Sequence, residues 1–158
     1  MNNNILLSLM RECRNFFVDS YESGVFVLSN KKISLANEYK IGQYLLLTGS
    51  ILNDGVYKIT DISSWVHELE ISEDIFEVWD GTIYALRIPP DFLQLAAEIQ
   101  TFLESPGGAI SPYISETVLN VHSWARATNK DTGAPAGWQI MFADKLSPFR
   151  RMFTTIDI

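Results

Sequence analysis

The chain has 158 residues, of which 47% are hydrophobic and 20% are charged. This composition is close to the average of globular domains, so it excludes a disordered tail, a collagen-like fibre and a low-complexity scaffold. Twelve basic residues against nineteen acidic ones give a net charge of −7. A negative net charge is the wrong sign for a protein that binds nucleic acid by neutralising its phosphates.

The length predicts a single domain, 1–158. The sequence shows neither an apolar run of about 18 residues nor the pattern of a secretory leader, which predicts an intracellular soluble protein without a membrane partner. Cys13 is the only cysteine, so it can form no internal disulfide and cannot build a zinc cluster with the two histidines. We therefore expect no metal and no other cofactor.

The N-terminal region has the spacing of an amphipathic helix. Asn2 to Asn4 offer N-caps, and apolar residues from Ile5 to Phe17 recur every three or four positions. The pattern predicts a helix over 5–20. Cys13 lies on the apolar stripe of this helix, which favours a buried thiol over a nucleophile.

The region 24–88 is the predicted β part of the chain. Asp54-Gly55 and Asp80-Gly81 each separate two apolar runs, and Asp-Gly tolerates the positive φ angles of a tight hairpin turn. Turns this short join antiparallel neighbours. The expected fold class is α+β, with a small antiparallel β-sheet or partly closed barrel between an N-terminal helix and C-terminal helices. The two predicted hairpins pair 44–50 with 56–62 and 75–79 with 82–88.

The C-terminal part, from residue 89 onward, is predicted to be helical and extended. Pro89-Pro90 cannot donate to a β ladder but suits the first turn of a helix, and Asp91 favours the same helix end. The apolar spacing predicts helices over 91–104 and 136–147, with extended or loop structure over 110–128.

The last six residues carry large apolar side chains at Phe153, Ile156 and Ile158. Such a terminal segment either folds back on its own sheet or adds a strand to the open sheet edge of a neighbour. The sequence leaves both alternatives open. These three residues belong to the predicted interaction surface.

Acidic charge is concentrated in the middle of the chain. Residues 61–104 hold ten acidic residues and one basic residue. Such a cluster is typical of a solvated face; a functional acidic surface would instead meet a basic partner or line a passage for DNA. Glu73, Asp74 and Glu77 are the predicted members of that interaction surface.

No catalytic or cofactor motif is complete. His67-Glu68 begins a zinc-protease helix motif, but Ile71 stands where the second histidine is needed. Two alternatives stay open: a small hydrolase that uses carboxylates between Glu68 and Asp80, and a ligand-binding module that exposes its tryptophans. The sequence itself predicts no catalytic, metal-binding or cofactor-binding residue.

Short stretches along most of the chain, from about residue 15 to 151, keep a particular order and spacing. They are Ile41-Gly42-Gln43-Tyr44, Gly49 through Tyr57, Gly81 through Phe92 with Glu98-Ile99, Ser111-Pro112-Tyr113, Ser115-Glu116, Gly133-Ala134-Pro135, Trp138-Gln139, Phe142, Leu146 and Arg150-Arg151. Together they resemble a family of short proteins of tailed bacteriophages and prophages of Gram-positive bacteria, encoded with the proteins of the neck between capsid and tail. The chain departs from the family pattern after Ser115-Glu116, where Thr117 to Val121 replace a Phe-Gly-Gly-Tyr segment.

The resemblance implies a non-enzymatic structural component of the virion neck, a head-tail connector that acts through ring or complex assembly. The implied partners are portal, neck or tail proteins and further copies of the chain, with DNA passing through at most. The implied location is the cytoplasm of the bacterial host during assembly, and the virion afterwards.

Overall fold

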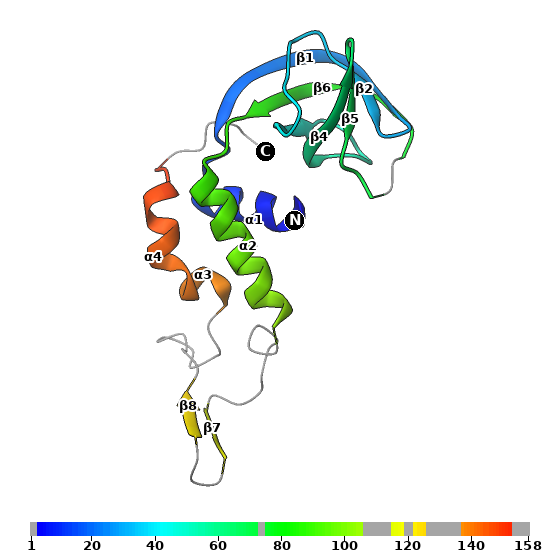
Figure 1. The fold of residues 1–158 in the computed structure, drawn as a ribbon. Helices are drawn as coiled ribbons and strands as arrows, with labels where there is room; N and C mark the ends of the chain where they lie inside the picture. The colour runs from blue at the N-terminus through cyan, green and yellow to red at the C-terminus, as the bar shows by residue number, and fades with distance from the viewer. Residues whose placement is uncertain (1–2, 73–74, 106–114, 119–121, 126–136, 153–158) are drawn as a thin grey trace.

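The computed structural model has an α+β fold in which a small barrel lies beside a layer of helices (Figure 1). It describes residues 3–72, 75–105, 115–118, 122–125 and 137–152. The predicted fold class is therefore confirmed, and the barrel is closed.

The barrel has the strand order β1-β2-β5-β4-β3-β6, and β6 closes it against β1. All neighbouring strands are antiparallel. β1 pairs with β6 along most of its length and with β2 only at its last two residues, so it arches over the barrel from one side to the other (Figure 1). The strands are β1 (Val18–Ser29), β2 (Lys32–Ser34), β3 (Tyr44–Thr48), β4 (Gly55–Ser63), β5 (Val66–Leu69) and β6 (Glu77–Leu86).

The first helix, α1 (Asn3–Cys13), is shorter than the predicted helix over 5–20. Arg14 and Phe17 have φ angles of 51° and 52°, which no helix continues through. The Asn15 side chain holds this turn by accepting a bond from the Phe17 amide at 3.2 Å and donating one to the Phe149 carbonyl at 3.0 Å. The helix prediction is wrong after Cys13, and the β region begins at Val18 rather than at residue 24.

The first predicted hairpin is confirmed, because β3 pairs with β4. The second is wrong, because β6 runs through Asp80 and Gly81 without a turn. Gly81 is required for another reason: a Cβ at this position would lie 2.2 Å from the Thr48 carbonyl oxygen and 2.9 Å from the Trp79 indole. Here glycine marks a close approach of two backbones, not a reversal of the chain.

The barrel interior is filled by side chains from all six strands. Leu45, Leu47 and Ile83 are fully buried there, and the segment between β2 and β3 adds Tyr39. The Tyr39 hydroxyl donates a hydrogen bond to Glu22, whose other carboxylate oxygen accepts one from the Ala36 amide at 3.0 Å. This connecting segment is therefore fastened to β1.

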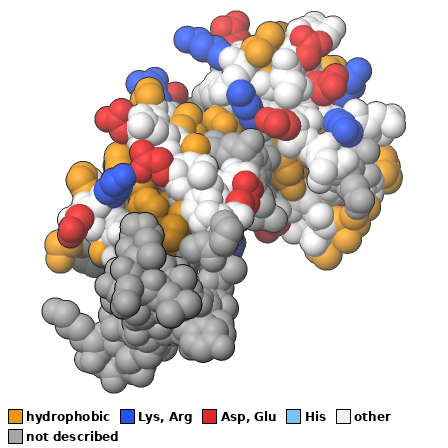
Figure 2. Space-filling view, turned by 60° about the horizontal axis from the view of Figure 1, so that its bottom comes forward, with side chains coloured by type: hydrophobic (Ala, Val, Ile, Leu, Met, Phe, Trp, Pro, Cys, Tyr) orange, Lys and Arg blue, Asp and Glu red, His pale blue; other side chains and the backbone are white. Residues whose placement is uncertain are grey.

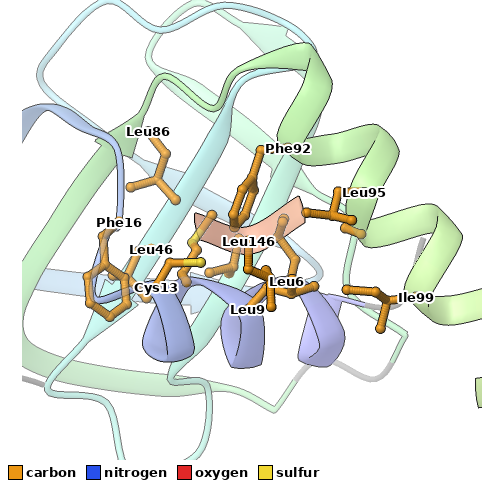
Figure 3. Packing of buried hydrophobic residues seen from close by; sticks show 13 residues of the cluster. Leu6, Leu9, Cys13, Phe16, Leu46, Leu86, Phe92, Leu95, Ile99 and Leu146 are labelled. Carbon is orange, nitrogen blue, oxygen red and sulfur yellow. The ribbon is translucent and has the colours of Figure 1, made fainter. Parts of the chain in front are cut away.

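A second apolar core joins the barrel to the helices. α2 (Pro90–Glu104) begins directly after the barrel at a proline, close to the predicted helix over 91–104. In Figure 3, side chains of α1, α2 and the barrel converge around Phe92, which is fully buried. The Phe92 ring meets Phe17 and Phe149 edge to face, with centroids 4.8 and 5.1 Å apart. The labelled members are Leu6, Leu9, Cys13, Phe16, Leu46, Leu86, Phe92, Leu95, Ile99 and Leu146.

The remaining elements follow α2. Two short helices, α3 (Trp138–Met141) and α4 (Ala143–Leu146), lie where one helix over 136–147 was predicted, and a 3-10 turn, η1 (Ser147–Phe149), follows them. β7 (Ser115–Val118) and β8 (His122–Ala125) pair in a separate two-stranded sheet. They fall within the stretch predicted to be extended or loop, the rest of which lies outside the described residues.

We expect Gly81→Ala to lower the free energy of unfolding by about 3 kcal/mol, because the added methyl group overpacks the contact between β3 and β6. Urea denaturation measures the loss. Asp80→Ala, one residue earlier on the same strand and exposed, is the matched control and should stay close to the parent. Equal stability of Gly81→Ala and the control would contradict the close approach.

Candidate functional site

Glu77, predicted to belong to an acidic interaction surface, forms hydrogen bonds to a loop of the barrel. Its carboxylate accepts hydrogen bonds from the Ser50 hydroxyl, from the Ile51 amide at 2.8 Å, from the Leu52 amide at 3.2 Å and from the Asn53 side chain at 2.8 Å. Glu77 is the first residue of β6, and the loop 50–54 connects β3 to β4. One carboxylate therefore fixes the backbone of a loop that comes from another part of the barrel.

The loop also carries bonds of its own. The Asn53 amide donates to the Ser50 hydroxyl oxygen at 2.6 Å, and the Ser50 amide donates to the Asp54 carboxylate at 2.8 Å. The Asn53 side chain donates a further bond to the Ile75 carbonyl at 3.0 Å. These bonds, together with those to Glu77, make the loop an ordered platform next to the start of β6.

The bonds to Glu77 also fix its charge. Donation from the Ser50 hydroxyl, followed by the bonds from Ile51, Asn53 and Leu52, keeps the pKa of the Glu77 carboxyl below its usual value. Its acceptor sites are used by the protein itself. This carboxylate is therefore poorly suited to serve as the general base of a hydrolase.

The Glu77 contacts present large apolar side chains to solvent. Ile51 is 91% exposed and Phe76 is 66% exposed. Val27 of β1 pairs directly with Val78 of β6, and both point outward. We call this surface the apolar tip; its members are Val25, Val27, Ile51, Leu52, Ile75, Phe76 and Val78, all at least 46% exposed. Clusters of exposed apolar side chains of this kind are typical of protein interaction sites.

The surroundings of the apolar tip contain carboxylates and no basic side chain from the same strands. The sequence has no Lys or Arg in 19–30, 50–54 or 75–86, the stretches that form the tip, whereas Lys31 and Lys32 follow β1 directly, Lys58 lies in β4 and Arg11 of α1 acts electrostatically on Asp54. Asp54 and Asp80 lie next to it and are exposed. Figure 2 shows one face of the molecule, on which hydrophobic side chains gather in groups between scattered charged ones.

Other sequence candidates have structural roles. His67 is 2% exposed, and its Nδ1 lies 3.2 Å from the Trp65 carbonyl oxygen in the barrel wall. Trp79 is buried inside the barrel, whereas Trp65 is 59% exposed. Among the described residues no group of three or more His, Cys, Asp or Glu is placed to hold a metal ion.

A polar cleft of about 360 Å³ lies at the start of β1. Two acidic residues, Asp19 and Glu38, and two basic ones, Lys40 and Arg87, line it together with uncharged neighbours. The Arg87 guanidinium forms an ion pair with Asp19 at 2.8 Å. With its charges balanced, the cleft shows no preference for a ligand of either sign.

Of the six predicted interaction residues, the structure describes Glu77. Glu73 and Asp74, and the tail residues Phe153, Ile156 and Ile158, lie outside the described residues. Within the described part of the chain, no helix is both long enough and apolar enough to cross a membrane.

Comparison of the chain with protein-family models, with curated proteins and with solved structures found no match.

Glu77→Gln should loosen the loop 50–54, because a neutral amide accepts weaker bonds from the Ile51 and Leu52 amides. The folded-state pKa of Glu77 is lowered, so the carboxylate contributes stability at neutral pH and loses it as the pH falls through that pKa. NMR should show the two amide protons shifting upfield in the variant at pH 7 and, in the parent, on acidification. Glu68→Gln on β5 is the control. Unchanged Ile51 and Leu52 amides in Glu77→Gln would refute the contact.

Proposed function

We propose that the chain is a non-enzymatic structural component of a phage or prophage neck, a head-tail connector that works by assembling with itself and with portal, neck or tail proteins. Two observations support the proposal. The ordered series of stretches from residue 15 to 151 resembles that family, and the apolar tip offers a preformed surface for another protein. The proposed location is the host cytoplasm during assembly and then the virion.

The apolar tip is the observation that carries most weight. A surface that exposes Ile51 and Phe76 to water costs solubility unless it is covered in the working state. The hydrogen bonds to Glu77 hold the loop in place before any partner arrives, so less conformational entropy is lost on binding. A preorganised apolar surface suits a component of a permanent assembly.

Neither alternative function gains a specific observation. The hydrolase would need paired carboxylates in a cleft, and Glu77 is occupied by loop 50–54. The ligand-binding module would need coplanar exposed tryptophans, and Trp79 is buried. The assembly role therefore remains the better supported proposal.

Disruption of the gene in its phage or prophage tests the connector role. We expect particles to fail at joining, so that filled heads and free tails accumulate and the infectious titre falls by several orders of magnitude. Electron microscopy of the lysate and a plaque assay measure both effects. Supplying the intact gene in trans is the control and should restore joining. Normal titres from the disrupted phage would overturn the proposal.

We also expect that some carboxylates of the acidic middle third of the chain, residues 61–104, line a channel for DNA. A surface that repels the phosphate backbone lets the genome pass, whereas a basic surface would retain it. Glu73→Lys with Asp74→Lys should leave the isolated fold intact and reduce genome ejection. Glu77 is left unchanged because it fixes the loop 50–54. Glu73→Gln with Asp74→Asn is the control for lost charge alone, and full infectivity of the lysine variant would contradict a channel lining.

A further inference from the structure

We propose that the chain forms a two-fold dimer in which the free edge of β1 pairs antiparallel with the same edge of a second copy. The inference rests on the self-assembly proposed above and names the strand that would carry it. Three features of the described residues support it: unpaired backbone along β1, a composition without the usual protection of an edge strand, and the fit of the strand to its own copy.

The backbone of β1 is paired on one side only along most of its length. β6 pairs with β1 from Val18 to Leu28, whereas β2 reaches only Leu28 and Ser29. Among the described residues, no backbone group of 19–27 bonds to the backbone of a segment other than β6. The stretch 19–27 is therefore an edge, and its donors and acceptors that point away from β6 are available to another strand.

This edge is open on both faces of the strand. Tyr21, Ser23 and Val25 are exposed on one face, and Ser20 is exposed on the other. A Cβ at Gly24 would lie within 4 Å of no described atom beyond its two chain neighbours. Space beside β1 is therefore available to a second strand.

The edge lacks the features that protect exposed strands. Natural sheet edges commonly carry Lys or Pro, or are covered by other elements, which prevents pairing with other chains. The stretch 19–30 contains no Lys, Arg or Pro, and Tyr21, Val25 and Val27 on it are at least 46% exposed. Aromatic and β-branched side chains of this kind are typical of strands that pack against neighbours. Pairing along this edge would also cover Val25 and Val27, two members of the apolar tip.

A second β1 suits this edge better than an unrelated strand. Two copies paired antiparallel satisfy both edges at once, whereas a single peptide strand would bring a new unpaired edge of its own. A two-fold axis through the middle of 19–27 places Ser23 opposite its own equivalent and Tyr21 opposite Val25 of the second copy. Aromatic and β-branched side chains form favourable cross-strand pairs. The register therefore brings the exposed apolar side chains of the two copies together.

Charge does not oppose this pairing. The stretch 19–27 contains two carboxylates. In the proposed register, Asp19 lies opposite Val27 of the second copy, and Glu22 lies opposite Gly24 of the second copy, so no two carboxylates face each other across the strands. Glu22 also accepts a hydrogen bond from the Ala36 amide at 3.0 Å, which turns its charge toward its own copy.

Two matched charge variants test both the dimer and its register. We expect the parent to have about twice the monomer mass of 17.9 kDa in analytical ultracentrifugation. Tyr21→Lys with Val25→Lys places like charges opposite each other twice, so the Kd of the dimer should rise roughly tenfold or more. Tyr21→Glu with Val25→Lys instead places opposite charges there and should restore the dimer.

The outcomes of this comparison are distinct. A monomeric parent would overturn the proposal and leave the edge to an extended segment of another protein. A double-lysine variant that stays as dimeric as the parent would also overturn it, and so would a Glu and Lys variant that dissociates as readily as the double-lysine one. Circular dichroism and melting temperature check that each variant keeps the parent fold.

Cross-linking at the two-fold axis is an independent measurement that leaves the edge uncharged. Ser23→Cys should give a disulfide-linked dimer under oxidising conditions, because the two sulfur atoms lie on neighbouring strands at the same position. Native Cys13 is buried and does not compete. Ser63→Cys, exposed on β4, is the matched control and should stay monomeric on a denaturing gel. Equal cross-linking of both variants would contradict the pairing.

Two further comparisons separate β1 pairing from the rest of the apolar tip and from the connector role. Ile51→Lys with Phe76→Lys makes the same change of charge at exposed positions of the tip that are not on β1 and should stay dimeric. Dissociation of this variant would move the contact to the tip and overturn the proposal. If particles lacking the gene fail to join while the purified parent is monomeric, the connector role stands and the β1 pairing falls. Normal titres together with a β1-paired dimer would refute the connector role alone.

Discussion

The barrel depends on the uninterrupted passage of β6 past the end of β3. At Gly81 the two backbones are so close that a single Cβ would lie 2.2 Å from the Thr48 carbonyl oxygen. Because the strand continues, it pairs with β1 on one side and β3 on the other, which closes the barrel. The same strand begins at Glu77, which fixes the loop 50–54, and ends at Leu86, which packs in the helical core.

β3 shows how one short strand serves both cores. Leu45 and Leu47 point into the barrel, and Leu46 between them packs against the helices. A strand with one wet face would alternate apolar and polar residues, whereas three successive buried leucines require cover on both sides. The helices supply that cover, so burial of α1 and α2 is part of what stabilises the barrel wall. The closed barrel and the helical layer are therefore coupled through the same residues.

The sequence predicted those elements whose signals are local. Pro90 at the start of α2 and the apolar runs on either side of Asp54-Gly55 act within a few residues, and both predictions were confirmed. The end of α1 and the course of β6 were missed, because Phe17 and Gly81 are determined by contacts with distant segments. The apolar tip was not predicted for the same reason. It depends on the contact between Glu77 and Ser50, which are 27 positions apart, and no local pattern in either segment predicts that contact.

Charge counting alone does not distinguish Glu77 from the exposed carboxylates of residues 61–104, such as Asp61 and Glu70. Glu77 contributes to the acidic count, but its carboxylate accepts hydrogen bonds from the loop 50–54. It therefore stabilises that loop. The surface next to Glu77 is the apolar tip. Carboxylates such as Asp80 lie near it, and β1 and β6 themselves contain no basic residue. Hydrophobic burial would supply the affinity of such a surface for a partner.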